Sequence, residues 1–518
     1  MLLHAPTKSV IMKVDDPLKF RSLMPGVTRI IPHEDYNLQI KHTLDTTQLL
    51  RNLGFNVPSP IETQYQWPGK YTPFDHQRVM ADFLTTVKKG FNLSEMGTGK
   101  TYPTLWAADF LMKAGVVRRA LVLSPMSTMD TVWKQDIFDV LMHRRCGIAH
   151  GSMDHRMKVF NSDQDFYILN HDGIALPEVA KLVRRRKDID LIIVDEVSMF
   201  RNSRTDKYKL LSWVMEKKER LWCLTGTPCP NAPTDAWALA KLVAPERVPR
   251  FFGSFQRQTM IKVTDHKWAP KTDAKEKAFE AMKPAVRFEK KDCLTLPPVI
   301  TMNRQAQLTK QQVKMFTEMK NEMVAEAQNA TITAVNAADK INKLRQILCG
   351  SIKGPDGSYM LLDHRPRLQE LRDCIDEASA KVIVIVPFKG IIQALSHELV
   401  KSGYTVGVIN GDVAPKARDR VINQFKHEDD PKVLLCHPKV MAHGLNLTVA
   451  DTTIFYAPIY SNDEYEQVIE RFNRTGQTRK MTIVRLAAHP LEWEIYRMVD
   501  TRRLNQKGIL DLYDTITH

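Results

Sequence analysis

A candidate phosphate-binding loop occupies residues 93–101, with the sequence LSEMGTGKT. Its two glycines let the backbone bend so that successive N–H groups can converge on phosphate oxygens. Lys100 can reach the β- and γ-phosphates of a nucleotide, and the Thr101 hydroxyl can ligate Mg²⁺. Ser94 stands where the full pattern has a glycine, so this stretch alone also fits an ordinary turn that opens a helix.

Two adjacent carboxylates, Asp195 and Glu196, follow the hydrophobic run 191–194 further along the chain. Phosphoryl transfer needs one carboxylate to hold the Mg²⁺ shell and one group to orient or deprotonate the attacking water. Asp195 suits the first role and Glu196 suits the second. A strand that ends in Asp-Glu is commonly a solvated turn, but its position after a phosphate loop favours the catalytic interpretation.

The stretch 467–477 carries two arginines, Arg471 and Arg474, that share one face of a predicted helix. Either could enter a nucleotide site as an arginine finger, which stabilises charge in the transition state. The alternative is a basic helix face that binds water or DNA phosphate. Gln467 and Gly476-Gln477 accompany the arginines and favour the finger.

Two shorter stretches carry weaker signals. Phe74 could stack on an adenine ring and the Gln77 amide could read its edge, although an ordinary helix start with a satisfied glutamine also fits. The hydroxyls in 224–228 could sense a phosphate, or they could belong to a plain turn. These two stretches support a nucleotide site only because they occur in the expected order with the other motifs along the chain.

Short apolar runs, separated by helical stretches, must position these residues. Such runs predict parallel sheets that are buried on both faces, where ligands gather at the carboxyl ends of the strands. Between the two sets of runs lies a helical, Met- and Gln-rich region at about 251–350, interrupted by Pro297-Pro298. The predicted strands are 120–124, 167–170, 191–195 and 222–225, then 382–386, 405–409, 433–436, 453–456 and 481–486.

The fold class is therefore α/β, with two lobes, a helical insertion and a small N-terminal module. In that module we expect a strand at 10–14 and a helix at 46–54. We expect four segments: an N-terminal module with a candidate role in substrate recognition (1–68), an ATP-binding lobe (69–250), a helical insertion and inter-lobe linker (251–360), and a second lobe with C-terminal helices (361–518).

Composition narrows the class of partner. The 518 residues suggest roughly three domains, and the net charge of +15 favours a polyanionic partner, nucleic acid first and an acidic membrane second. No apolar run approaches the ~20 residues of a membrane span, and the N-terminus lacks a signal-peptide layout. The seven cysteines are scattered without C-x-x-C spacing, so we expect no structural metal, no disulfide framework and a cytoplasmic location.

The ordered motifs resemble those of the Swi/Snf family of superfamily-two helicase-like ATPases, from Tyr71 to the C-terminus. Gln77 corresponds to the family's adenine-reading glutamine, residues 96–101 to its first motif, and Asp195-Glu196 to its acidic pair. Further stretches resemble other family motifs: 121–125, 170–172, 200–209, 345–349, Gly411-Asp412, Arg420, Phe425 and 444–448.

Some residues depart from the usual family pattern. Val197 and Ser198 replace the more common ending of the acidic box, and residues 441–443 stand where many relatives have Gly-Gly-Leu. The stretch 443–447, preceded by His437-Pro438, resembles a compact branch often carried by phages and prophages. A viral or bacterial origin follows from this resemblance, with the host cytoplasm as the location if the protein is viral.

The resemblance implies two tandem RecA-like lobes that close on ATP and Mg²⁺ while they grip duplex or branched DNA. DNA-bound proteins are further expected partners, and a membrane is not. The implied catalytic residues are Lys100, Asp195, Glu196, Arg471 and Arg474; the nucleotide-binding residues are Phe74, Gln77, Met96, Gly97, Thr98, Gly99, Lys100, Thr101, Gly444 and Gln467; and the metal ligands are Thr101 and Asp195.

The implied function is an ATP-dependent double-stranded DNA translocase that remodels forks, recombination intermediates or protein–DNA complexes. One alternative is a strand-separating DNA or RNA helicase, since the same engine serves both nucleic acids. The other is a scaffold without catalysis. Basic clusters at 184–187 and 217–218 could bind the DNA backbone or could form a solvated face.

Overall fold

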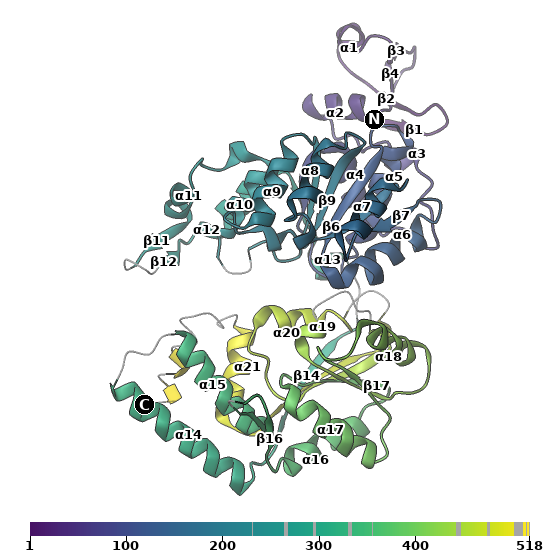
Figure 1. Ribbon diagram of the computed structural model, residues 1–518. Helices are drawn as coiled ribbons and strands as arrows, with labels where there is room; N and C mark the ends of the chain where they lie inside the picture. Colours follow the sequence, from purple (N-terminus) through teal and green to yellow (C-terminus); the bar gives the residue numbers. More distant parts are fainter. Residues whose placement is uncertain are drawn as a thin grey trace. The chain divides into compact units, whose positions relative to one another are not determined.

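The computed structural model describes residues 1–229, 232–263, 268–293, 297–329, 334–354, 356–441, 447–473, 477–501, 511–513 and 515–516. The chain forms two compact units, residues 1–294 and 295–518 (Figure 1). Each unit is built around its own parallel sheet, and each has its own hydrophobic core.

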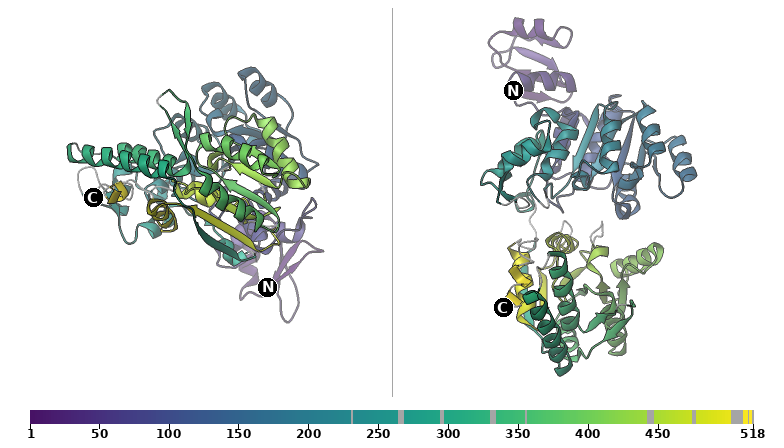
Figure 2. Two further views of the ribbon diagram at one scale, coloured as in Figure 1. Left: turned by 90° about the horizontal axis from the view of Figure 1, so that it is seen from below. Right: turned by 60° about the vertical axis from the view of Figure 1, so that its left-hand side comes forward.

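A small antiparallel sheet forms the N-terminal module of the first unit, seen as purple arrows in the right-hand view of Figure 2. Its strand order is β1-β2-β4-β3, and Val10, Met12, Leu38 and Ile40 form the core on its inner face. The elements are β1 (Leu2–His4), β2 (Ser9–Met12), α1 (Pro17–Leu23), β3 (Thr28–Ile30), β4 (Leu38–Lys41), α2 (Leu44–Asn52) and α3 (Ile61–Gln64).

The larger sheet of the first unit has seven parallel strands in the order β13-β5-β10-β9-β6-β8-β7. Two hydrophobic clusters lie on its two faces, so helices cover both sides and the strands are nearly all apolar. Leu224 pairs with Asn92 on one side and with Asp195 on the other, so the carboxyl ends of three strands are in register. The strands are β5 (Lys89–Asn92), β6 (Arg119–Ser124), β7 (Cys146–Ile148), β8 (Phe166–Asn170), β9 (Ile189–Asp195), β10 (Arg220–Leu224) and β13 (Ala285–Val286).

The helices of this unit alternate with the strands. The helix α5 is buried on most sides because it contacts α4 and α6 and contributes to the hydrophobic cluster on one face of the sheet. The helices are α4 (Asp75–Thr86), α5 (Thr101–Lys113), α6 (Gln135–Val140), α7 (Met153–Asn161), α8 (Pro177–Arg185), α9 (Asp206–Met215), α10 (Asp235–Val243), α11 (Phe252–Thr259), α12 (Ala274–Ala281) and α13 (Lys290–Cys293), with a hairpin of β11 (Met260–Lys262) and β12 (Trp268–Pro270) between α11 and α12.

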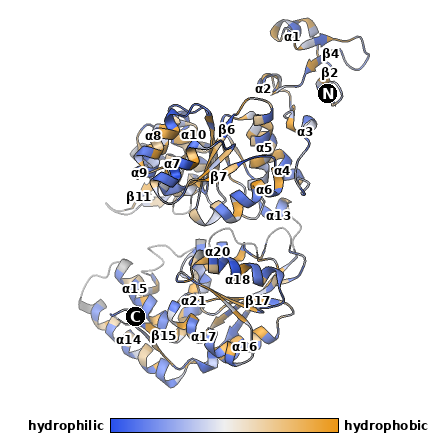
Figure 3. Ribbon diagram, turned by 45° about the vertical axis from the view of Figure 1, so that its right-hand side comes forward, coloured by the Kyte–Doolittle hydropathy of each residue, from blue (hydrophilic) through white to orange (hydrophobic). Residues whose placement is uncertain are grey.

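The second unit has a six-stranded parallel sheet in the order β14-β21-β20-β17-β19-β18. Hydrophobic residues concentrate in strands such as β17, as the colouring of Figure 3 shows. Its strands are β14 (Val299–Gln305), β17 (Lys381–Ile385), β18 (Val406–Ile409), β19 (Val433–Cys436), β20 (Ala450–Phe455) and β21 (Met481–Ala487), with a hairpin of β15 (Ser351–Lys353) and β16 (Tyr359–Leu361). Its helices are α14 (Lys310–Asn329), α15 (Ala334–Cys349), α16 (Arg365–Asp376), α17 (Lys389–Lys401), α18 (Pro415–His427), α19 (Pro438–Met441), α20 (Asn462–Ile469) and α21 (Pro490–Asp500).

The α/β fold class, the nine predicted parallel strands and the two predicted N-terminal elements are confirmed, with ends that shift by at most three residues. The region predicted as a helical insertion does hold helices, but it also contributes β13 to the first sheet and β14 to the second. The division into four segments stays a prediction. Among the described residues, no helix is long and apolar enough to cross a membrane.

Candidate nucleotide site

The predicted phosphate loop connects β5 to α5 and has the backbone shape that its glycines allow. Gly97 and Gly99 have φ values of +82° and +73°, a region that residues with a Cβ rarely adopt. The Lys100 ammonium donates to the carbonyl oxygens of Ser94 (2.8 Å) and Glu95 (2.9 Å). The lysine thus lies across the loop where it can exchange these carbonyls for phosphate oxygens, and Thr101 begins α5 beside it.

Ser94, which replaces the first glycine of the full pattern, links the loop to the neighbouring edge of the sheet. Its hydroxyl accepts a hydrogen bond from the Phe288 amide (3.1 Å), and the Lys290 amide donates to the Glu95 carboxylate (2.9 Å). The Glu95 amide in turn donates to the Phe288 carbonyl (3.0 Å). The departure from the pattern therefore has a structural reason, since a glycine could not make the first of these bonds.

Gln77 joins the start of α4 to the phosphate loop. Its side-chain oxygen accepts from the Phe74 amide (3.1 Å), and its side-chain nitrogen donates to the Gly99 carbonyl (3.2 Å). His76 stacks on the Phe74 ring (5.6 Å between centroids) and lies 3.0 Å from the Thr98 carbonyl. The structure therefore brings Gln77 and the loop together through protein contacts, and adenine recognition by Phe74 and Gln77 stays a prediction.

The Asp195 carboxylate lies at the carboxyl end of β9. Its Oδ2 accepts from the indole N–H of Trp133 (2.9 Å), and its Oδ1 accepts from the Glu196 amide (3.0 Å). Burial raises the pKa of Asp195 to about 6; the Trp133 hydrogen bond opposes this shift, the Glu196 charge adds to it, and the Lys100 charge opposes it. The site thus holds a carboxylate that is costly to ionise without a cation beside it.

Glu196 adopts a left-handed backbone conformation with φ of +50°, which is uncommon for a residue with a side chain. Its Oε1 accepts hydrogen bonds from the hydroxyls of Ser198 (2.5 Å) and Thr225 (2.9 Å). A Cβ on Gly226 would lie 2.9 Å from the Met96 amide nitrogen, so the turn after β10 approaches the phosphate loop closely. The strain at Glu196 and these contacts aim one carboxylate into the loop region.

The oxygen donors of this edge fit Mg²⁺. The Thr101 hydroxyl and the Asp195 carboxylate are hard oxygen ligands of the kind that Mg²⁺ prefers, and it keeps waters and phosphates as its remaining ligands. With a pKa of about 6, Asp195 is mostly ionised at neutral pH, as metal binding requires. Among the described residues there is no cluster of three or more His, Cys, Asp or Glu side chains that would form a metal cage.

The predicted residues of the second unit lie on and after α20. Gln467 is in the last turn of this helix, and Arg471 follows its end, where its carbonyl accepts from the Leu447 amide (2.9 Å). Arg474 and Gly444 lie outside the described residues, so their predicted roles stay predictions.

Two buried arginines hold the segment that leads into α20. Arg345 of α15 donates to the Pro458 carbonyl (2.6 Å) and lies between the rings of Phe388 and Tyr460, 5.1 Å from each centroid. Arg367 of α16 donates to the Tyr456 carbonyl (2.9 Å) and forms a bidentate pair with Glu492. Both arginines are almost completely buried, and each donates to a main-chain carbonyl of the loop before α20. These hydrogen bonds hold the loop in place.

Three of the six residues in the basic clusters at 184–187 and 217–218 make internal contacts. Arg184 pairs with Glu216 (3.0 Å), Arg186 pairs with Asp188 (2.5 Å), and the Lys218 ammonium donates to the Ile189 carbonyl (2.6 Å). Burial lowers the pKa of Lys218 to about 8. These three residues stabilise the protein's own fold, whereas Arg185, Lys187 and Lys217 are exposed, so both interpretations of the clusters stay open.

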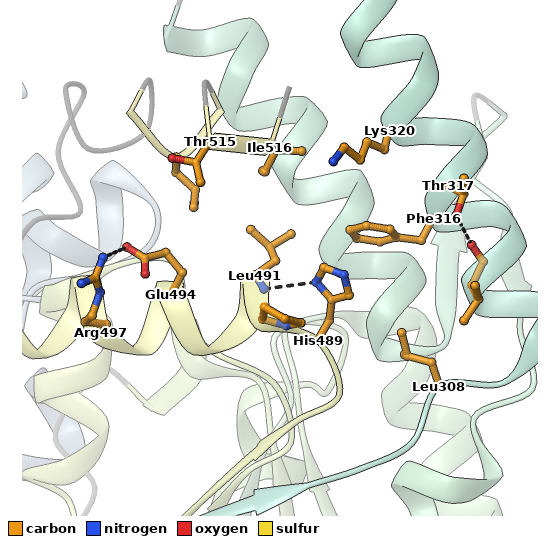
Figure 4. Close-up of a pocket in the computed structure, with 13 residues that line it drawn as sticks. Leu308, Phe316, Thr317, Lys320, His489, Leu491, Glu494, Arg497, Thr515 and Ile516 are labelled. Atoms are coloured by element: carbon orange, nitrogen blue, oxygen red, sulfur yellow. Dashed lines mark hydrogen bonds and ion pairs between the residues drawn. The ribbon is translucent and has the colours of Figure 1, made fainter. Parts of the chain in front are cut away.

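A cavity of about 520 Å³ lies in the second unit between α14, the start of α21 and the C-terminal residues (Figure 4). Phe316, His489, Leu491 and Ile516 line it, and the His489 and Phe316 rings are 4.3 Å apart. None of the predicted site residues lines this cavity, and its mainly apolar wall is unlike a phosphate site.

Sequence reasoning missed three contacts of the site. These are the Trp133 bond to Asp195, the Thr225 bond to Glu196, and the bond between the Phe288 amide and Ser94 that links the phosphate loop to β13. Trp133 lies in a π-helical turn, Met129–Lys134, a feature that is frequent at functional sites but has no clear sequence pattern. Phe288 follows the two-residue strand β13, which is too short to give a periodic signal. Only the hydroxyls at 224–228 offered a usable hint.

Comparison with known families agrees with this geometry. Residues 76–351, more than half of the chain, match the SNF2-related domain, and residues 366–476 match the helicase conserved C-terminal domain. The fold and site thus define the class of helicase-like, nucleic-acid-dependent ATP hydrolases. The chain belongs to the SNF2-related family.

Several curated proteins are similar to this chain. Protein p41 of Acyrthosiphon pisum secondary endosymbiont phage 1 is 24% identical over 85% of this chain and 98% of its own length. An uncharacterized ATP-dependent helicase of Mycoplasma genitalium is 24% identical over 77% of this chain, and the ATP-dependent DNA helicase DDM1 of Arabidopsis thaliana is 24% identical over 77%. The chain spans only 38% of the Mycoplasma protein and 56% of the Arabidopsis protein.

A solved structure is also similar to the chain. The Sulfolobus solfataricus SWI2/SNF2 ATPase core in complex with dsDNA matches with a TM-score of 0.41 and 20% identity, over 86% of this chain and 96% of that one.

Proposed function

We propose that this chain is a double-stranded DNA translocase, which couples ATP hydrolysis to movement along DNA or to the remodelling of forks, recombination intermediates or protein–DNA complexes. The observation that carries the proposal is the ordered pair of family matches, SNF2-related at 76–351 and helicase C-terminal at 366–476. The name of the Arabidopsis relative, an ATP-dependent DNA helicase, supports DNA as the nucleic acid.

In this proposal Lys100 binds the β- and γ-phosphates, and Thr101 and Asp195 hold Mg²⁺. Glu196 orients the attacking water, with Ser198 and Thr225 fixing its carboxylate. Bound Mg²⁺ would neutralise negative charge on the phosphates. Because hydrogen bonds already hold the Asp195 and Glu196 carboxylates, these two groups need little reorganisation at the chemical step.

The second unit supplies the remaining groups. Arg471 and Arg474 reach the γ-phosphate when the two lobes close, while Gln467 and Gly444 contact the nucleotide. Closure and release of the lobes would alternate the grip on DNA, so the mechanism is conformational gating with charge stabilisation at the chemical step. The similarity to a phage protein supports action in a bacterial host's cytoplasm.

An ATPase assay over a panel of nucleic acids tests the substrate class. At one fixed salt concentration, linear and forked duplex DNA should stimulate hydrolysis more than single-stranded DNA or RNA. Displacement of a third strand from a DNA triplex should accompany hydrolysis and report movement. ATP turnover that no nucleic acid stimulates would contradict the proposal.

A strand-separating DNA or RNA helicase is the second candidate, because the Mycoplasma relatives are named ATP-dependent helicases. Stimulation mainly by RNA, or unwinding of a tailed duplex, would favour it over a translocase. ATP turnover at background level in every condition would favour a scaffold without catalysis.

A further inference from the structure

We infer that the outer face of the N-terminal sheet is a phosphate-binding surface that adds nucleic-acid backbone contacts to the motor. This deepens the proposed function, on which it rests. The face is defined by the outward residues Leu2, His4, Ser9, Ile11, Arg29, Gln39 and Lys41 of strands β1 to β4, because the alternate residues form the buried core.

The charges of this outer face all have one sign. Arg29 on β3 and Lys41 on β4 are exposed, and none of the seven outward positions is acidic. Residues 1–68 are all described by the structure. Among the described residues, the side chains of Arg29 and Lys41 have no ion-pair or hydrogen-bond partner. Two cations with no carboxylate to neutralise them make a surface that attracts anions.

Both cations line a small polar notch. It has a volume of about 200 Å³ and is lined by Arg29, Lys41, Gln39 and Ser9, together with the backbone around Gly26. Ser9 is 3% exposed and forms its floor. The notch is too small for a drug-sized ligand, but its guanidinium and ammonium groups suit one phosphate.

Hydrogen bonds hold the floor of the notch. The Gln39 side-chain nitrogen donates to the hydroxyl oxygens of Ser9 (2.9 Å) and Thr7 (3.2 Å), and those two hydroxyls are 2.6 Å apart. His4 Nδ1 lies 2.7 Å from the Thr7 hydroxyl. These bonds use both N–H donors of the Gln39 amide, so they order the floor of the notch, while Arg29 and Lys41 supply the donors for an anion.

What distinguishes this face is that its two cations line one notch beside hydrogen-bonded polar groups. In the basic clusters of the large sheet, Arg184, Arg186 and Lys218 are paired within the protein, while Arg185, Lys187 and Lys217 are exposed. Phosphate contacts carry no sequence information, so this face would raise affinity for any nucleic-acid backbone. A free phosphate would meet the same groups, but a polyanion can contact both cations at once.

The test compares two charge-matched double variants of the full chain. Arg29→Gln/Lys41→Gln removes the two cations of the outer face, and Lys19→Gln/Arg21→Gln removes two exposed cations of α1, whose Phe20 packs on the inner face. Fluorescence anisotropy measures binding of a labelled linear duplex between about 50 and 200 mM salt. Thermal unfolding of both variants checks that the module still folds.

The first variant should bind duplex more weakly and lower the slope of log K against log salt by about 0.9 for each lost phosphate contact, or by about 2 in total. The control should keep the wild-type slope. Equal slopes in both variants and in the wild type would overturn the inference. An equal loss of duplex affinity in the two variants would also overturn it. If no nucleic acid stimulates wild-type ATPase, the proposed function fails, whereas stimulation with unchanged slopes contradicts only this inference.

Discussion

The two units hold their candidate functional residues in opposite ways. In the first unit the functional side chains bond directly to their surroundings: Lys100 to the loop carbonyls, Glu196 to two hydroxyls and Asp195 to an indole. In the second unit, buried charges hold main-chain carbonyls behind the functional segment. In the first unit, burial makes the charged form of Asp195 unfavourable. In the second unit, the buried charges of Arg345 and Arg367 support the fold.

This difference predicts opposite results from mutation. Charge removal at the site of the first unit should abolish hydrolysis and should cost little stability, since functional sites often trade stability for activity. Charge removal behind α20 should destabilise the second unit. The following changes test the contrast, from the largest expected effect to the smallest.

Lys100→Ala should reduce ATP hydrolysis by about 10²–10³-fold or more, because it removes a preorganised charge at the phosphates. Steady-state ATPase measurements check this, with Lys88→Ala as the control. Lys88 is also a lysine of the first unit, but it is exposed and pairs with Glu219 at the surface. Near-normal turnover in Lys100→Ala would contradict the assignment of the phosphate loop.

Arg367→Met should destabilise the second unit by about 3–5 kcal/mol, because it leaves the Glu492 carboxylate buried without its partner. Hydrogen–deuterium exchange should show faster opening of β20 and α20, with β9 of the first unit unchanged. The control is Arg365→Met, since Arg365 lies on the same helix but is exposed.

A second variant separates charge from packing at this pair. Arg367→Met/Glu492→Leu should recover much of the lost protection, because apolar side chains can replace a buried pair. Equal protection in Arg367→Met and the wild type would show that the pair does not support the fold.

Asp195→Asn should stabilise the metal-free protein at pH 7.5 by about 1–3 kcal/mol while hydrolysis is lost. The folded-state pKa of Asp195 is about 6, raised mainly by burial from an ordinary value of 3.8. The group's contribution to stability is therefore complete below about pH 3.8 and is lost as the pH rises through about 6.

The advantage of the asparagine should accordingly shrink as the pH falls from 7.5 to 5. Thermal unfolding in EDTA at several pH values measures it, and Asp190→Asn on the same strand, whose carboxylate is paired with Arg118, is the comparison. A less stable Asp195→Asn variant at pH 7.5 would contradict the interpretation that burial makes the charged form of Asp195 unfavourable.

Ser94→Ala should weaken the brace between the phosphate loop and β13 by about 1–2 kcal/mol, because the Phe288 amide loses its acceptor. Exchange of the Phe288 amide should speed up. Ser127→Ala is the matched control, since the Ser127 hydroxyl has no partner among the described residues. Unchanged exchange at Phe288 would show that the brace carries no stability.

Sequence patterns predicted the parts of the fold that depend on apolar runs. The run 191–195 became β9, which ends at Asp195, and the charge of Lys100 from the phosphate loop acts on that carboxylate. The strand β5 was missed because Lys89-Gly90-Phe91-Asn92 contains a single large apolar residue. It is buried only because β10 and β13 pair with it from distant parts of the chain.

Sequence patterns also could not predict side-chain contacts between residues that are far apart in the chain. Nothing near Trp133 indicates that its indole bonds Asp195, and nothing near Arg345 indicates that it holds Pro458. Likewise, the clusters at 184–187 and 217–218 resemble an anion site in sequence, but the carboxylate partner of Arg184 and the carbonyl partner of Lys218 become visible only in the fold.

The central proposal is that Arg471 of the second unit takes part in hydrolysis of ATP bound at the phosphate loop of the first unit. The most direct test measures DNA-stimulated hydrolysis and binding of a fluorescent ATP analogue in Arg471→Ala. The account predicts that the analogue still binds, through Lys100 and its loop, while stimulated hydrolysis falls by about 10³-fold or more. Hydrolysis near the wild-type rate in Arg471→Ala would contradict it.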